Sequence, residues 1–306
     1  MERIYLSPEK EGFYGAYYPH PDGEEACIIA MMGDAVDDRL AMAGVKWFQS
    51  RGVSVLAMSP GDHDYSHHNY PLERFGAAID WLGGRGCRKF GVAGASTTGM
   101  LALLAASYYP DLTLTVAMSA SDFVMEGFYK ENGVERPGDG ESTVSVEGQP
   151  LPYLPYAYRH PQYWEALRAE AKRGHNLIAS REMFDESERL HPVQEEEKIR
   201  IENIHGRILV IGAEDDCLWD ACRYMRRMQE RIESRDHRGA WDYLSYSHGT
   251  HFVFPQGLLK NAMPVGSSLL VALAFREGRR HPILCWKTRK DIDRRVSQAI
   301  AKWKEE

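Results

Sequence analysis

Residues 89–99 read Lys-Phe-Gly-Val-Ala-Gly-Ala-Ser-Thr-Thr-Gly and join a short apolar run to the start of a helical pattern. The first five of these residues are typical of a buried strand, and the apolar spacing over residues 98–108 is typical of a helix. Ser96 stands in the turn between them. This is a nucleophile-elbow arrangement, in which a serine hydroxyl is exposed in a tight turn where Gly94 and Gly99 leave the necessary space.

The elbow has a simpler interpretation, because Gly-x-Ser-x-x-Gly is a short pattern and Ser96 could be a helix N-cap. Serine is a weak nucleophile at its free pKa. A catalytic interpretation therefore requires a base and an acid that orients the base, with the acid first in chain order and the histidine after it.

Strand and helix patterns alternate on both sides of the elbow. The expected strands cover residues 11–18, 26–32, 53–58, 89–93, 112–118, 207–212 and 241–246; the expected helices cover residues 37–50, 71–82, 98–108, 224–232, 265–276 and the tail from residue 290. This alternation is typical of a mostly parallel sheet wound by right-handed crossovers. The fold class that it predicts is α/β, with helices on both faces of a central sheet.

The alternation stops over about residues 122–202, which we expect to form a cap or lid insertion in a single domain spanning residues 1–306. The segment contains a stretch rich in Gly, Pro and Glu over residues 133–140, an aromatic and proline-rich stretch over residues 150–164, and helical pieces. Its aromatic side chains either face an acyl chain or ring system or pack the cap on the core. They are Tyr153, Tyr156, Tyr158, Tyr163 and Trp164.

The composition limits the partners of the chain. It has 306 residues, a formal net charge of −7, 43% hydrophobic residues and 26% charged residues, as in an ordinary globular protein. The negative charge argues against nucleic acid as the main partner. No apolar run approaches the ~18 residues that span a bilayer, so we expect no membrane partner. The N-terminal residues lack a secretory pattern, so we expect a cytoplasmic location. The sequence leaves a homo-oligomer open.

No cofactor or metal is expected. Five cysteines without a CxxC pair indicate reduced, mostly buried thiols; they are Cys27, Cys87, Cys217, Cys222 and Cys285. A cluster after the third expected strand has the residue types of metal ligands: Asp62, His63, Asp64, His67 and His68. The i, i+4 spacing of its histidines suits a metal only on a helix, whereas the preceding residues indicate a loop, so we expect a solvated loop.

Acidic residues and histidines follow two later strands. Residues 207–212 lead into Glu214, Asp215 and Asp216, and residues 241–246 lead into His248 and His251. Open α/β sheets build their sites at the carboxyl ends of the strands. The chain order is then serine, acid, histidine, which predicts a catalytic triad of Ser96, Asp216 and His251.

Each of the two later members has a competitor. We prefer Asp216 to Asp215, because Asp216 lies further beyond the strand and precedes apolar residues that can shield its bond to the imidazole. We prefer His251 to His248, because a Gly-Thr turn leads to His251 and phenylalanines follow it. His248 is then left to line the pocket or cap the loop.

The expected oxyanion hole consists of backbone amides. The amide of Thr97 follows the nucleophile, and a second donor is expected in the loop after residues 26–32. Gly33, Asp34 and Ala35 are all candidates, of which we name Asp34. Its carboxylate would have to point away from the developing negative charge.

Four features together resemble one known family: the elbow, the Gly-Gln-Pro-Leu-Pro-Tyr stretch over residues 148–153, the run over residues 214–219, and the segment around His251. They are similar to the acyl-CoA thioesterase and bile acid-CoA:amino acid N-acyltransferase (BAAT) C-terminal catalytic domain, over about residues 24–255. The resemblance implies an α/β-hydrolase fold with a Ser-Asp-His or Cys-Asp-His site acting on acyl thioesters. A serine at the elbow resembles the hydrolytic members.

The expected function is thus that of a serine hydrolase of the thioesterase or carboxylesterase type, which cleaves a small-molecule acyl ester or thioester through an acyl-enzyme. Three alternatives stay open. The first is an amidase or peptidase, and the second an acyltransferase in which an amine replaces water. The third is a non-catalytic ligand-binding protein that has kept the fold.

Overall fold

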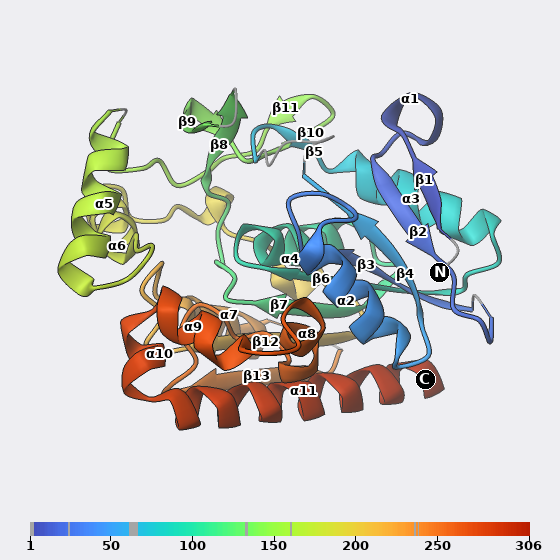
Figure 1. Ribbon diagram of the computed structural model, residues 1–306. Helices are drawn as coiled ribbons and strands as arrows, with labels where there is room; N and C mark the ends of the chain where they lie inside the picture. The colour runs from blue at the N-terminus through green and yellow to red at the C-terminus, as the bar shows by residue number, and fades with distance from the viewer. Residues whose placement is uncertain are drawn as a thin grey trace.

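The computed structural model describes residues 3–23, 25–60, 67–131, 134–159, 161–235, 237 and 239–306 (Figure 1). Its centre is an eight-stranded sheet with the strand order β1-β2-β4-β3-β6-β7-β12-β13. The strands are β1 (Ile4–Leu6), β2 (Gly15–Tyr18), β3 (Ala26–Met31), β4 (Ser54–Met58), β6 (Lys89–Ala95), β7 (Leu112–Met118), β12 (Arg207–Ala213) and β13 (Trp241–Tyr246). From β4 to β13 all neighbours are parallel, and β1 and β2 are antiparallel at one edge. This confirms the predicted mostly parallel sheet.

Helices cover both faces of the sheet, because alternate side chains of the buried strands supply two separate cores. One core contains residues of α3 (Glu73–Gly84), α4 (Thr97–Tyr108) and α7 (Ala221–Ser234). The other contains residues of α2 (Arg39–Gln49), α8 (Gln256–Ala262) and α11 (Pro282–Glu305). In β3, Ile29 contributes to the first core and Ile28 to the second, as expected from the period of two in a strand.

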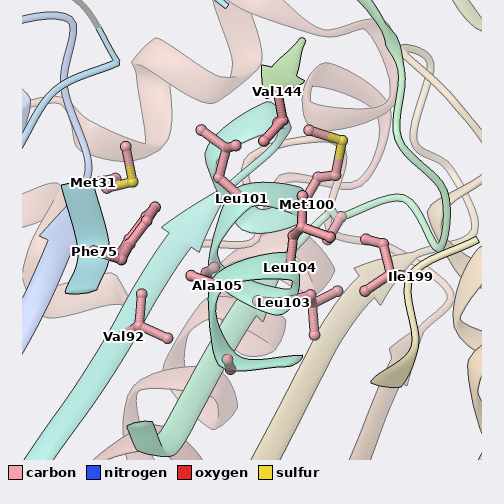
Figure 2. Close-up of a cluster of buried hydrophobic side chains, with 14 of the residues drawn as sticks. Met31, Phe75, Val92, Met100, Leu101, Leu103, Leu104, Ala105, Val144 and Ile199 are labelled. Carbon is pink, nitrogen blue, oxygen red and sulfur yellow. The ribbon is translucent and has the colours of Figure 1, made fainter. Parts of the chain in front are cut away.

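Helix α4 is the most deeply buried helix near the elbow. Its residues from Thr97 to Ala106 are all buried, which fits a sequence that is apolar on every side rather than along one stripe. Figure 2 shows the side chains of α4 among Val92 of β6 and Phe75 of α3, together with Val144 and Ile199 from the segment between β7 and β12. The start of α4 is therefore held by packing on several sides.

Between β7 and β12 the chain leaves the central sheet, where we expected a cap. This segment contains the expected helical pieces α5 (Gln162–Gly174) and α6 (Arg181–Leu190), and also the 3-10 helices η1 (Glu195–Glu197) and η2 (Ile201–Asn203). Strands β8 (Glu126–Glu131) and β9 (Val134–Ser142) form a hairpin, and β10 (Val144–Val146) pairs with β11 (Gln149–Pro150) and β5 (Tyr70–Pro71). These short strands were not predicted, because Gly and Pro interrupt the alternation that marks a strand.

Some of the predicted boundaries of strands and helices were wrong. The strand expected over residues 11–18 begins only at Gly15, after the short helix α1 (Pro8–Glu11). The helix expected over residues 265–276 is divided into α9 (Ser267–Ala274) and α10 (Arg276–Arg280). The division falls at Phe275, whose buried side chain lies in an extended backbone. Tertiary packing of one aromatic ring here overrides a continuous helical pattern.

No helix in the described ranges is by itself long and apolar enough to cross a membrane. Helices α8 and α9 pass this test of length and composition only as a pair, and they meet at an angle of 94°.

Candidate active site

The elbow is strained in the way that its sequence predicts. Ser96 lies between β6 and α4 with φ 61° and ψ −129°, a backbone conformation that few non-glycine residues adopt. Its amide donates to the carbonyl of Met118 at 2.8 Å. A β-carbon on Gly94 would overlap the carbonyl of Thr98, so only glycine permits this close approach.

The hydroxyl of Thr98 ties the elbow to the neighbouring strand. It accepts from the amide of Ala95 at 3.0 Å and lies 2.8 Å from the carbonyl of Met31 at the end of β3. This role of Thr98 was not predicted. The signal for it is a short hydroxyl side chain in the first turn of a helix, where it can bond to local backbone groups.

Asp216 and His251 are hydrogen-bonded to each other in a buried place. Oδ2 of Asp216 lies 2.8 Å from Nδ1 of His251, and the two side chains are 0% and 6% exposed. The other carboxylate oxygen of Asp216 accepts from the amide of Leu218 at 2.8 Å. Because Nδ1 faces the carboxylate, Nε2 is the imidazole nitrogen that is left to act on a substrate or nucleophile.

Trp219 packs against the imidazole. Its ring meets the ring of His251 edge-on at a centroid distance of 4.9 Å, and its indole N–H donates to the carbonyl of Ser119 at 2.9 Å. These contacts limit the orientations open to the imidazole and keep water from the Asp216–His251 bond. The apolar residues after Asp216 were expected to shield this bond, and Trp219 occupies a shielding position.

Ser119 connects the elbow side of the site to the histidine side. It follows Met118, which accepts the Ser96 amide, and its own hydroxyl donates to the carbonyl of His251 at 3.2 Å. Ser119 also has a positive φ of 45°. No hydrogen bond between the Ser96 hydroxyl and the imidazole is found in the described part of the chain. The link that the structure shows between the two halves of the site runs through Met118 and Ser119. This role of Ser119 was not predicted.

Asp215 and His248, the two alternatives to the predicted acid and base, lie close to each other. Oδ1 of Asp215 accepts from the amides of Gly249 and Thr250 at 3.0 and 2.7 Å, and Oδ2 lies 3.4 Å from Nδ1 of His248. Burial raises the pKa of Asp215 despite these bonds. Asp215 thus holds the turn that leads to His251, while His248 stacks on His281 at 4.1 Å.

The two expected oxyanion donors differ in their surroundings. Thr97 is the first residue of α4, so its amide lies at the positive end of the helix dipole, directly after Ser96. The amide of Asp34 instead donates to Oδ2 of Asp38 at 2.7 Å, and the amide of Ala35 donates to the same oxygen at 3.1 Å. Asp38 is the N-cap residue of α2, and its carboxylate accepts hydrogen bonds from these two loop amides as well as from the first turn of the helix. The structure therefore gives no support to Asp34 as second donor.

The aromatic residues of the expected cap pack in a row that reaches the site. Tyr163 contacts Tyr156, Tyr156 meets Phe184 edge-on, and Phe184 meets Trp219 edge-on, with centroid distances between 5.2 and 5.6 Å. Trp219 then contacts His251. Tyr156 and Tyr163 are buried in the first core, so these two rings pack the segment between β7 and β12 against the rest of the domain.

The cysteines are free thiols, as predicted, and Cys217 alone is not fully buried. Burial, with a smaller effect of the Asp216 charge, raises the pKa of Cys217 to about 12, so this thiol stays protonated at neutral pH. No group of side chains that could hold a metal ion is found among the described residues. Of the cluster considered above, Asp62, His63 and Asp64 lie outside the described residues.

The sequence profile described as "BAAT / Acyl-CoA thioester hydrolase C terminal" matches residues 70–256, more than half of the chain. The chain belongs to the BAAT / acyl-CoA thioester hydrolase C-terminal family. The match includes Ser96, Asp216 and His251. No curated protein matches the chain.

Solved structures of esterases have a similar fold. The Pyrococcus furiosus esterase Pf2001 is 12% identical with a TM-score of 0.50, over 97% of this chain and 94% of that chain. Est1E from Butyrivibrio proteoclasticus is 11% identical with a TM-score of 0.47, over 98% of this chain and 100% of that chain. The architecture of this BAAT-family chain is that of an α/β hydrolase, and its family and fold support a hydrolase.

Proposed function

We propose that this member of the BAAT family is a serine hydrolase that cleaves acyl esters or thioesters through Ser96, His251 and Asp216. The buried hydrogen bond between Asp216 and His251 carries the proposal. A buried carboxylate fixes the tautomer of the imidazole and stabilises the imidazolium that forms when the imidazole takes a proton. The strained Ser96, at the end of β6, supplies the nucleophile; in the sheet, β7 lies between β6 and β12.

The proposed reaction has two halves. Nε2 of His251 takes the hydroxyl proton as Oγ of Ser96 forms a bond to the acyl carbonyl carbon, and the amide of Thr97 stabilises the oxyanion. The bond from this carbon to the leaving oxygen or sulfur then breaks, and the imidazolium returns the proton to the leaving group. Water adds to the acyl-enzyme in the same way and releases the acid.

Thioesters are included among the substrates because the family profile is named for thioester hydrolysis. A panel of acyl-CoA thioesters, p-nitrophenyl esters and amides tests this choice. We expect thioesters and esters to be hydrolysed and amides to react far more slowly. Faster amide turnover would assign the protein to amidases instead.

Covalent labelling tests the serine assignment. A fluorophosphonate probe should label the wild-type protein but not Ser96→Ala, and Ser96→Ala should lower kcat on the order of 10³-fold or more with the fold intact. Ser107→Ala is the matched control, since Ser107 lies at the other end of the same helix and its hydroxyl donates to the carbonyl of Leu104. Equal labelling or turnover in Ser96→Ala and Ser107→Ala would reject the proposal.

A further inference from the structure

Exposed apolar side chains gather at one end of the molecule. Eleven large apolar side chains of the described residues are exposed, and eight of them fall in three short segments. Scattered single apolar residues are normal on a protein surface, but a group of this size indicates contact with another apolar phase. The eight are Leu177, Ile178, Val265, Leu269, Leu273, Ile283, Leu284 and Trp286.

The three segments are neighbours in space. The amide of Leu177 donates to the carbonyl of Ala274 at the end of α9, and the amide of Arg276 donates to Oδ1 of Asn176, both at 2.8 Å. Helix α10 then connects α9 to the start of α11. Figure 1 shows α9, α10 and the start of α11 together at the lower left of the molecule. We refer to residues 177–178 and the exposed side chains of residues 260–290 as the α9–α11 surface.

The charge of this surface is opposite to that of the whole chain. Residues 260–290 contain seven basic and one acidic side chain, a net charge of +6 in a chain of net charge −7. Of the seven basic side chains, only Arg289 is buried. The single acidic residue, Glu277, is paired with Arg280 at 3.2 Å and with His281 at 3.6 Å. The range that holds six of the eight exposed apolar side chains thus carries an excess of positive charge.

We propose that the α9–α11 surface binds peripherally to a bilayer that contains anionic lipid. Leucines that enter the interface, with basic side chains at the level of the head groups, are the combination that favours this mode of binding. It departs from the expectation of no membrane partner, which rested on the absence of a spanning run, because peripheral binding requires no spanning helix. A symmetric contact with a second copy is disfavoured, because it would place two surfaces against each other that each carry six basic side chains and one acidic side chain, not counting the buried Arg289.

The surface adjoins the loops that carry the candidate catalytic pair. Phe252, next to His251, meets Phe275 edge-on at 4.9 Å between α9 and α10. Cys217, next to Asp216, donates from its thiol to the carbonyl of Ile178 at 3.5 Å. Membrane binding does not depend on the proposed chemistry, so Ser96→Ala should bind as the wild type does. The two proposals can therefore fail separately.

Co-sedimentation with vesicles tests the proposal. The full-length protein should sediment with vesicles of phosphatidylglycerol and phosphatidylcholine at low salt, and much less with phosphatidylcholine alone or at 0.5 M salt. Lys287→Gln with Lys290→Gln removes two exposed charges and should weaken binding roughly 25-fold. Leu269→Gln with Leu273→Gln should weaken it about tenfold or more.

Matched controls lie elsewhere on the surface. Leu190 is 58% exposed at the end of α6, and Lys302 is exposed near the far end of α11. Leu190→Gln and Lys302→Gln should bind like the wild type. Equal binding to both vesicle types, or unchanged binding of the two surface variants, would overturn the proposal. A wild-type dimer that dissociates in Leu269→Gln with Leu273→Gln would also overturn it, because the surface would then be a protein interface.

Discussion

Replacing Asp215 separates the positioning of the histidine from its chemistry. One oxygen of Asp215 accepts the amides of both Gly249 and Thr250, directly before His251. Thr250 has a φ of 60°, in the left-handed region that a β-branched residue rarely adopts. The carboxylate therefore stabilises a strained turn that aims the imidazole. We predict that Asp215→Ala lowers kcat although Asp216 and His251 are both present.

The size of the effect follows from what the variant loses. Hydrogen bonds to a charged acceptor contribute about 1.5–3 kcal/mol each, and a strained backbone of this kind costs about 1–3 kcal/mol. Water can replace part of the loss in Asp215→Ala, which leaves about 3 kcal/mol against the productive turn. With this free energy acting on an equilibrium between the productive turn and a second conformation, the fraction of molecules with a correctly placed imidazole falls roughly 100-fold. Asp215→Asn keeps an acceptor oxygen for both amides and should lose less than about tenfold.

Steady-state kinetics on a p-nitrophenyl ester measure this difference. We expect kcat to fall in the order wild type, Asp215→Asn, Asp215→Ala, with KM changed much less than kcat, because the turn positions the base. Thermal unfolding of each variant accounts for any loss of folded protein. Wild-type kcat in Asp215→Ala would refute the reasoning. So would an Asn variant as slow as the Ala variant, because the shared acceptor oxygen would then be irrelevant.

Three further substitutions test separate parts of the structure. Gly94→Ala should destabilise the protein by about 3 kcal/mol and abolish activity, because the new β-carbon overlaps the carbonyl of Thr98; chemical denaturation measures this. Trp219→Phe keeps an edge contact with His251 but loses the 2.9 Å indole hydrogen bond, so kcat should fall roughly fivefold in the same ester assay. Burial raises the pKa of Glu170 from 4.5 to about 6, so its stabilising protonated form is fully populated below pH 4.5 and is lost as the pH rises through 6. Glu170→Gln should then raise the free energy of unfolding by about 1 kcal/mol at pH 7.5, and the gain should shrink at pH 5.

Each of these substitutions has a control of the same chemistry. A β-carbon on Gly84 meets no atom within 4 Å, so Gly84→Ala should be tolerated, and equal stability of Gly84→Ala and Gly94→Ala would contradict the steric argument. Trp286→Phe at an exposed site should leave kcat unchanged. Exposed Glu165→Gln should lack the pH-dependent gain. A gain in Glu170→Gln that grew toward pH 5 would reverse the expected sign.

The central sheet could be predicted from local pattern because its strands are buried on both faces. Residues 112–118, for example, are apolar except for Thr113 and Thr115, and the observed β7 has the same bounds. The short strands between β7 and β12 could not be predicted from such runs, because Gly and Pro interrupt them and one of them also pairs with a distant segment. This strand, β10, pairs with β5, more than 70 residues earlier in the chain.

The candidate site was predictable where residue type and chain order carry the information. Serine at the elbow, and the choices of Asp216 over Asp215 and of His251 over His248, came from such arguments, and the structure pairs Asp216 with His251. The roles of Ser119 and Asp38 could not be predicted. Both act through backbone groups that become neighbours only when the sheet has formed.

The row of rings from Tyr163 to His251 makes a continuous series of contacts from the segment between β7 and β12 to the imidazole. A substitution that changes the packing of the buried Tyr156 should therefore reach Phe184 and, through Trp219, the imidazole. Changes in this segment would then alter the placement of the base as well as the local packing. A redesign of the segment between β7 and β12 therefore has to keep these ring contacts if the imidazole is to keep its orientation.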